Sequence, residues 1–276
     1  MTTSTITVSP LTSAVGAEIT GLDLRQELDG ATVSDIKKAL NDHLVLFFRD
    51  QDVAPEDQLR FCQIFGPLKV SEFSPNYSAG ASLPPGLTVI DQNGRVDLFT
   101  DTWHTDHTFT DEIPTVTVLR SVQIPSKGGD TCFANMCLAY DALSPQMQTF
   151  LEGLTAVHTS ENQLKLNMSV RPETLPEAVH PVITVHPETG RKLIFVNVNY
   201  TQRIVELTAD ESAMVLKYLF DHVKQPQLQC RFRWTKNAIA VWDNRAAQHC
   251  AVYDYTERRV MHRCLAQGVR PVGVHG

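Results

Sequence analysis

The spacing of hydrophobic residues predicts helices early in the chain. Apolar residues recur every three or four positions over residues 33–42 and again over residues 54–66, which is the pattern of a helix with one buried face. Between these helices, the uninterrupted apolar run LVLFF at 44–48 predicts a buried strand. The first quarter of the chain is therefore expected to mix helices with strands.

Most of the chain beyond residue 110 has the pattern of strands. Segments rich in β-branched and aromatic residues, often alternating with polar ones, predict strands at 114–124, 192–198, 228–234, 238–243 and 259–266. Two helices are expected among them. One covers about 144–154, and the other begins with the capping box TADE at Thr208 to Glu211. The second helix is expected to point four apolar side chains inward, namely Met214, Leu216, Leu219 and Phe220.

Many strands, few helices and no alternation of strand with helix favour a mainly β fold with flanking helices, a barrel or a jelly roll, over a doubly wound sheet. The length suits a single domain over residues 1–276. Two stretches lack a clear pattern. The segment at about 71–100 is rich in Ser, Pro and Gly and predicts a long, lid-like loop, and the segment at about 160–182 predicts an irregular insertion.

Composition narrows the function classes. A formal net charge of -7 argues against nucleic acid as a partner, because binding phosphates requires a basic face. No apolar stretch is long enough for a membrane span, and the first residues have neither the charge nor the apolar run of a signal peptide. The six cysteines show no C-x-x-C spacing and are expected to be reduced thiols. A cytoplasmic location is therefore expected.

The segment TWHTDHTF contains the first candidate for chemistry. His104 and Asp106 are two positions apart, so in an extended segment their side chains share a face and could supply two ligands to a metal. Such H-x-D tripeptides are common by chance, and an ordinary polar turn is the alternative. His107 falls off that face if the segment is extended.

The last third of the chain adds a third candidate ligand and two arginines. His249 follows an apolar strand, in a segment that looks like a turn. Two histidines and one carboxylate on one side of a metal leave the other positions open. In the strand at 259–266, Arg259 and Arg263 share a face, about 13 Å apart at ~3.3 Å per residue. Two arginines among apolar neighbours favour anion binding, with structural salt bridges as the alternative.

Several blocks, in this order, resemble the taurine dioxygenase/2,4-D dioxygenase family of Fe(II)/2-oxoglutarate-dependent oxygenases: GAEITGLDL, VLFFRDQ, WHTDHTF, GGDT, HPETGRKLIFVN, WDNRAAQH and RRVMHR. The resemblance covers nearly the whole chain. It implies a double-stranded β-helix of the jelly-roll, cupin-like kind, with iron held by His104, Asp106 and His249, and with 2-oxoglutarate and O2 as co-substrates. These three residues would then carry the catalysis.

The resemblance also assigns the co-substrate site and the reaction. Thr131 of the GGDT block and Arg259 would hold the distal carboxylate of 2-oxoglutarate. Arg258 is the competing arginine, but it falls on the opposite face of the strand. Arg263 would hold the anionic head of a small organic substrate, of the sulfonate, alkyl sulfate or aryloxyalkanoate type. Hydroxylation of a C–H bond would release succinate and CO2, and the product would collapse wherever the hydroxylated carbon carries a leaving group.

The substrate pocket departs from the taurine enzymes of the family. Ser71 stands where they have a histidine, Thr100 where they have an asparagine, and His107 where they have a small apolar residue, whereas Tyr200 keeps an aromatic position. Other blocks are closer to alkylsulfate and aryloxypropionate dioxygenases. These four residues and Arg263 are the substrate-binding candidates. The sequence leaves the substrate open, and His107 is interpreted either as a pocket contact or as a residue turned away.

Two other classes are compatible with the ligand pattern. A zinc hydrolase or isomerase on the same barrel could use two histidines and an aspartate, but it would have no use for a carboxylate grip at Thr131 and Arg259. A non-catalytic binding protein would have no reason to keep the three ligands. Family members are commonly oligomeric, so a homodimer or homotetramer is expected.

Overall fold

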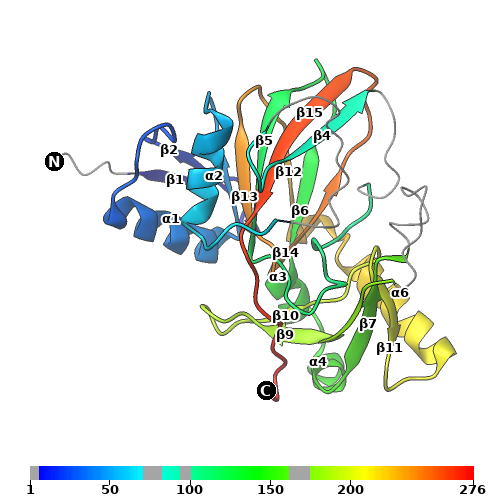
Figure 1. Cartoon of the computed structure of the whole chain (residues 1–276). Helices are drawn as coiled ribbons and strands as arrows, with labels where there is room; N and C mark the ends of the chain where they lie inside the picture. The colour runs from blue at the N-terminus through cyan, green and yellow to red at the C-terminus, as the bar shows by residue number, and fades with distance from the viewer. Residues whose placement is uncertain (1–5, 71–82, 94–100, 162–174) are drawn as a thin grey trace.

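Two β-sheets form the centre of the molecule (Figure 1). The structure is a computed structural model that describes residues 6–70, 83–93, 101–161 and 175–276. The larger sheet contains, in spatial order, β1 (Thr7–Pro10), β2 (Ala17–Thr20), β3 (Val45–Phe48), β13 (Ile239–Asp243), β5 (Val116–Gln123), β15 (Arg258–Leu265) and β4 (Thr88–Asn93). The smaller sheet contains β12 (Gln229–Phe232), β6 (Thr131–Asn135) and β14 (Ala247–Ala251).

Aromatic side chains fill the space between the two sheets. Phe47 of β3 stacks on Phe232 of β12, with ring centroids 4.0 Å apart, and meets Phe133 of β6 edge-on at 5.7 Å. Trp242 of β13 lies 5.5 Å from Phe133. All four are at most 2% exposed. Large buried rings of this kind contribute much of the apolar area that stabilises a sheet pair.

Alternation along the central strands divides the core into two layers. Phe47 points toward the smaller sheet, whereas its neighbour Phe48 belongs to a second apolar cluster on the other face. Helices α1 (Gly30–His43) and α2 (Pro55–Gln63) cover that second face, through buried residues that include Ile36 and Phe61. The two predicted helices and the strand between them are confirmed. Leu44 ends α1 in the left-handed conformation, with φ of 62°, and β3 begins at the next residue.

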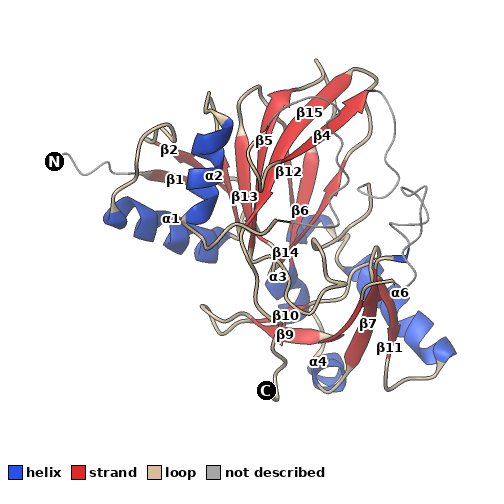
Figure 2. Cartoon of the chain, viewed as in Figure 1, coloured by secondary structure: helices blue, strands red, loops and turns tan. Residues whose placement is uncertain are grey.

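A second group of elements completes the fold, as Figure 2 shows. A three-stranded sheet contains β11 (Thr201–Ile204), β7 (Thr155–Thr159) and β8 (Glu177–Pro181), and a two-stranded sheet contains β10 (Lys192–Ile194) and β9 (Ile183–Val185). The accompanying helices are α3 (Met136–Asp141), α4 (Pro145–Glu152), α6 (Ala209–His222) and the short 3-10 helix η1 (Pro226–Leu228). Within the described residues, no helix has the length and apolar character needed to cross a bilayer.

The predicted caps are present, but one inward residue was assigned wrongly. The hydroxyl of Thr208 accepts a hydrogen bond from the backbone N–H of Glu211, and the carboxylate of Glu211 accepts one from the backbone N–H of Thr208, so the predicted capping box is confirmed. Leu216 and Leu219 are buried. Met214 is 67% exposed, because the face of α6 that packs on the fold is centred on positions 215, 216 and 219.

Three segments differ from their predicted structure. β4 lies inside the segment predicted as a loop at 71–100, and its pairing with β15 makes those residues an edge strand. β8 lies inside the insertion predicted at 160–182 and pairs with β7. The strand predicted at 192–198 ends at Ile194, after three residues paired with β9. In each case the pairing with another strand sets the bounds of the element, and local periodicity does not encode that pairing.

Candidate metal centre

The three predicted metal ligands come together in one buried cluster. His104, Asp106 and His249 each offer a ligand atom, and these atoms all lie within 4.8 Å of one another. Nε2 of His104 is 4.0 Å from Oδ1 of Asp106, and the two imidazole rings have centroids 4.2 Å apart. None of the three residues is more than 9% exposed. The arrangement has the size and donor set of a small metal site.

A backbone bridge positions the two histidines. His249 lies in β14, and its N–H donates to the carbonyl of His104 at 2.9 Å, while the N–H of His104 donates back at 3.0 Å. The expectation that His249 lies in a turn is wrong. The residues that precede it form a turn that connects β13 of the larger sheet to β14 of the smaller sheet, and pairing with β6 then makes Ala247–Ala251 a strand.

The histidine side chains are prepared for coordination. Nδ1 of His104 lies 2.7 Å from the carbonyl oxygen of Thr102, which makes Nδ1 the protonated nitrogen and turns Nε2 to the cluster. Burial lowers the pKa of His249 to about 3, and the positive charge of Arg263 acts in the same direction. A neutral imidazole is the form that binds a metal.

Asp106 reaches the cluster by a route that differs from the predicted one. The segment from Asp106 onward is a turn rather than a strand, and His107 has a left-handed φ of 57°. Strand alternation is therefore the wrong reason for the meeting of His104 and Asp106. Burial by itself would raise the pKa of Asp106, but His249, Arg263 and His104 outweigh it and hold that pKa well below its usual range. The carboxylate is ionised, as a ligand must be.

The donor set fits a divalent transition metal such as Fe(II). Two imidazoles and one carboxylate are a donor set that would leave coordination positions of such a metal open. The structure fits 2-oxoglutarate as well, because Arg259 is 4% exposed and its Nε has no hydrogen-bond partner among the residues that the structure describes. A buried guanidinium with an unsatisfied donor is costly unless an anion meets it.

The predicted co-substrate residues lie at the junction of β6 and β15. Thr131 is buried at the start of β6, where its hydroxyl accepts a hydrogen bond from Nε1 of Trp234 at 3.0 Å and keeps its own proton to donate. Gly129 has φ of 72°, and a Cβ there would lie 3.3 Å from Cδ of Arg259. The glycine turn thus lets β6 start close to Arg259. Arg258 is exposed and paired with Asp91, on the other face as predicted.

Three of the five candidate substrate residues, His107, Tyr200 and Arg263, lie among the described residues. Phe109 lies between His107 and Tyr200, and the three rings form a buried row with centroids 5.5 and 5.1 Å apart. Burial lowers the pKa of His107 to about 3, with Arg263 acting in the same direction. Nη1 of Arg263 lies 3.5 Å from Oδ1 of Asp106, so this cation borders the ligand cluster. The other two candidates, Ser71 and Thr100, lie outside the described residues.

Sequence reasoning missed two residues that hold Asp106. Thr117 of β5 donates from its hydroxyl to Oδ2 of Asp106 at 2.9 Å. Asn244 hydrogen-bonds to the backbone of Asp106 on both sides, at 2.8 Å to the N–H and 3.1 Å to the carbonyl. Asn244 belongs to the WDNR block and lies five residues before the predicted ligand His249 in the sequence, and this proximity could have indicated a role at the site. Thr117 has no local signal, because it is one residue in an ordinary strand.

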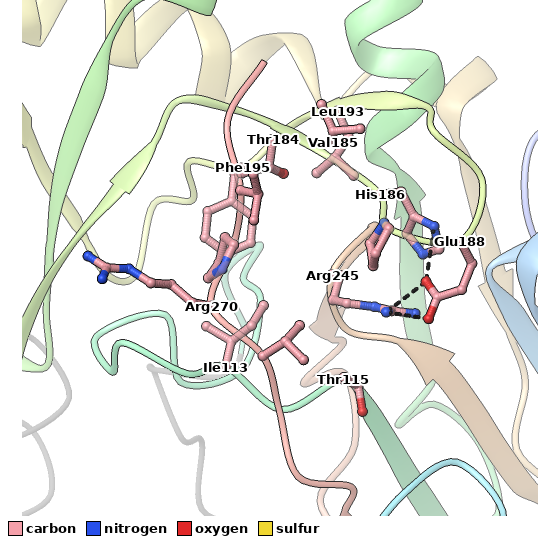
Figure 3. A pocket seen from close by; sticks show the side chains of 14 residues that line it. Ile113, Thr115, Thr184, Val185, His186, Glu188, Leu193, Phe195, Arg245 and Arg270 are labelled. Carbon is pink, nitrogen blue, oxygen red and sulfur yellow. Dashed lines mark hydrogen bonds and ion pairs between the residues drawn. The ribbon is translucent and has the colours of Figure 1, made fainter. Parts of the chain in front are cut away.

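A separate cavity of about 490 Å³ lies beneath the C-terminal segment (Figure 3). Its polar end is an ion network, in which Arg245 pairs with Glu188 at 2.8 Å and with Asp243 at 2.6 Å, and His186 bonds Asp243 at 2.9 Å. The walls are mostly apolar and include Ile113, Leu193 and Phe195. None of the predicted site residues lines this cavity, so it is distinct from the candidate metal centre.

The fold and the ligand cluster together define the class of protein. Two facing sheets that enclose two histidines and one aspartate are the arrangement of a jelly-roll, non-haem metal oxygenase. The chain belongs to the family described as taurine catabolism dioxygenase TauD, TfdA family, whose model matches residues 7–265.

Known proteins resemble the chain over nearly its full length. An alkylsulfatase from Acinetobacter baylyi is 35% identical, over 99% of this chain and 89% of the relative. An alpha-ketoglutarate-dependent sulfate ester dioxygenase from Pseudomonas putida is 34% identical, over 98% and 92%. The crystal structure of a taurine dioxygenase from Burkholderia xenovorans has a TM-score of 0.86 and 34% identity, over 98% of this chain and 92% of that chain.

These findings confirm the predicted family, the jelly-roll fold and the class of 2-oxoglutarate-dependent dioxygenase, an oxidoreductase. Enzymes of this family use Fe(II), 2-oxoglutarate and O2, as predicted. Family membership also decides against the zinc hydrolase and the non-catalytic binding protein. The roles of individual site residues stay predictions.

Proposed function

We propose that this enzyme hydroxylates the carbon that carries the sulfate group of a small sulfate ester. The observation that carries the proposal is the position of Arg263, whose guanidinium lies 3.5 Å from the candidate metal ligand Asp106. A cation beside the metal would hold an anionic head group and bring the adjacent C–H bond to the reacting centre. The similarity to an alkylsulfatase and to a sulfate ester dioxygenase supports sulfate esters ahead of sulfonates and aryloxyalkanoates.

The metal ligands in this proposal are His104, Asp106 and His249. Iron bound there, together with 2-oxoglutarate and O2, supplies the oxidising chemistry that hydroxylates a C–H bond, with release of succinate and CO2. Burial lowers the pKa of His249, and neighbouring charges hold the pKa of Asp106 below its usual range, so that the imidazole is neutral and the carboxylate ionised.

Thr131 and Arg259 would hold the distal carboxylate of 2-oxoglutarate. The guanidinium is a planar donor that matches a carboxylate with two parallel hydrogen bonds, and the Thr131 hydroxyl adds one more. Burial of both residues excludes water from these bonds and strengthens them. This arrangement would fix one end of the co-substrate.

The substrate would lie between Arg263 and the row of His107, Phe109 and Tyr200. The neutral imidazole of His107 can donate one hydrogen bond to a sulfate oxygen, while the two aromatic rings cover the apolar part of the molecule. Hydroxylation of the carbon attached to the ester oxygen gives an unstable product. Its C–O bond to sulfate breaks as the new hydroxyl loses its proton, which yields an aldehyde and inorganic sulfate.

The test is a screen of purified protein with Fe(II), ascorbate and 2-oxoglutarate. A primary alkyl sulfate, taurine and an aryloxypropionate are compared, and succinate and the released sulfate, sulfite or phenol are measured together. We expect succinate and sulfate in equal amounts with the alkyl sulfate. Sulfite release from taurine with no turnover of alkyl sulfates would contradict the substrate class. Sulfate release that persists without 2-oxoglutarate would contradict the reaction type.

We also propose that the enzyme is a cytoplasmic homodimer or homotetramer. Free thiols at all six cysteines support a reducing compartment. Met214 and Tyr218, one turn apart on the outer face of α6, are 67% and 46% exposed and form an apolar face suited to a second copy. Light scattering coupled to gel filtration measures the state. A monomer at micromolar concentration would contradict the oligomer, and recovery from an extracytoplasmic fraction would contradict the location.

A further inference from the structure

The two carboxylate oxygens of Asp106 lie in different surroundings. Oδ2 accepts a hydrogen bond of 2.9 Å from the hydroxyl of Thr117. Oδ1 lies 4.0 Å from Nε2 of His104 and 3.5 Å from Nη1 of Arg263, on the side where the ligand atoms converge. One oxygen is therefore engaged by the larger sheet, and the other faces the ligand cluster.

Thr117 is held firmly enough to direct this hydrogen bond. It is completely buried in β5, in the middle of the larger sheet. Its backbone is paired with Trp242 of β13 on one side and with Leu265 of β15 on the other. A β-branched side chain in a doubly paired strand has little rotational freedom, so its hydroxyl keeps one direction.

The backbone of Asp106 is fixed independently. The side-chain amide of Asn244 accepts from the N–H of Asp106 and donates to its carbonyl, and it also donates to the carbonyl of Pro114 at 3.0 Å. Asn244 is fully buried and its own N–H donates to Thr115 at 2.9 Å. The turn that carries Asp106 is thus tied to the same strand region as Thr117, so the carboxylate cannot rotate freely.

We propose that Thr117 is a positioning residue that reserves Oδ1 of Asp106 for the metal and makes the carboxylate a ligand through one oxygen. The inference rests on the ligand set in the proposed function. The consequence concerns the number of coordination positions that the protein would occupy on the metal. With one carboxylate oxygen in place of two, a metal held there would keep more of its coordination positions open for the 2-oxo acid and O2. A carboxylate bound through both oxygens would leave fewer.

The experiment compares Mn(II) binding to the full-length protein and to its variants, measured as the dissociation constant by titration. Thr117→Val removes the hydroxyl at nearly constant shape, and we expect roughly 10- to 100-fold weaker Mn(II) binding. Thr117→Ser keeps the hydroxyl and should restore the wild-type constant. Ser121→Ala is the matched control, because Ser121 is also fully buried in β5 but its hydroxyl donates to the carbonyl of Thr235 at 2.6 Å. It should lower the unfolding temperature without weakening Mn(II) binding.

Asp106→Ala in the same titration separates the two proposals. If Asp106→Ala abolishes Mn(II) binding and Thr117→Val binds Mn(II) as the wild type does, the positioning role is overturned and the ligand set stands. Equal weakening by Thr117→Val and Ser121→Ala also overturns it, since a loosened sheet would then be the cause. If Asp106→Ala binds Mn(II) normally, the ligand set and this inference both fail. Unfolding in the presence of a chelator checks each variant, and Thr117→Ala replaces Thr117→Val if the latter does not fold.

Discussion

His104 and His249 exchange two backbone hydrogen bonds, of 3.0 and 2.9 Å, across a bridge that joins an irregular segment to β14. The exchange accompanies a distance of 4.2 Å between the centroids of their imidazole rings. The histidine pair is therefore preorganised by the backbone, and the geometry of the site depends less on the ligand side chains themselves than on the strand that carries His249.

Removal of one histidine should abolish metal binding without unfolding the protein. In His249→Ala, the backbone bridge remains and one ligand is lost. A ligand that binds only the folded state at 100 times its dissociation constant stabilises the protein by about 2.7 kcal/mol. We expect the unfolding temperature of the wild type to rise on addition of Mn(II), and that of His249→Ala to stay constant. A full metal-induced rise in the variant would show that His249 is not a ligand.

The two arginines should divide the kinetic constants between them. Loss of a hydrogen bond to a charged group costs about 1.5–3 kcal/mol, or about 10- to 100-fold in an equilibrium constant. Arg259→Met should raise the KM for 2-oxoglutarate by this factor and leave that for the organic substrate nearly unchanged. Arg263→Met should do the reverse. Steady-state kinetics with each substrate varied in turn checks this, and equal effects of both changes on both constants would refute the division.

Arg259→Met should also leave the protein at least as stable as the wild type when no co-substrate is present. Burial lowers the pKa of Arg259, and its Nε has no hydrogen-bond partner within the described part of the chain, so the buried guanidinium destabilises the fold when no anion is bound. Chemical denaturation without 2-oxoglutarate measures this. A loss of stability would indicate that Arg259 has a structural partner.

His107→Asn tests the substrate pocket with little backbone strain. Asparagine tolerates the left-handed φ of 57°, whereas alanine at this position would add strain to the loss of the ring. We expect a KM for the organic substrate raised about 10-fold, as for one lost hydrogen bond, with 2-oxoglutarate saturation unchanged. If the selectivity among the three substrate types stays unchanged, the imidazole of His107 does not contact the substrate.

The stability of the metal-free protein should fall as the pH drops below about 6.5. Burial holds the pKa of His158 well below its ordinary value, so below pH 6.5 the unfolded chain binds a proton that the folded protein does not. Each such histidine costs about 1.4 kcal/mol per pH unit in this range. His158→Gln keeps a partner for Thr108 and should flatten the dependence by that amount. Urea unfolding with a chelator at several pH values checks it, and an unchanged slope would show that His158 is protonated in the folded state.

The buried carboxylates do not contribute to the pH dependence of stability in this range. The pKa values of Asp106 and Asp243 are both lowered, the first by nearby histidines and Arg263 and the second by Arg245 and His186, each against the opposing effect of burial. Their contribution to stability is present above the ordinary pKa of an aspartate, about 3.9, and is lost only below it. Between pH 6.5 and that range, the histidines dominate the slope.

The sequence by itself determined the elements whose causes are local. The capping box at Thr208 and the apolar periodicity of α1 and α2 act within a few residues, so they were predicted close to their observed positions. The order of the sequence blocks from GAEITGLDL to RRVMHR identified the family and, with it, His104, Asp106 and His249 as a set. Alternation in the strand at 259–266 placed Arg259 and Arg263 on one face because β15 is continuous there.

The way in which Asp106 is held, and the position of His107, depend on contacts between distant parts of the chain. Asp106 meets His104 through a turn that Asn244 fastens, and its carboxylate is oriented by Thr117, a residue of a different sheet element. His107 enters the buried row beside Phe109 because its left-handed backbone breaks the alternation that a strand would impose. Hydrogen bonds of this kind depend on the register of strands far apart in the chain, and no local pattern of residues specifies that register.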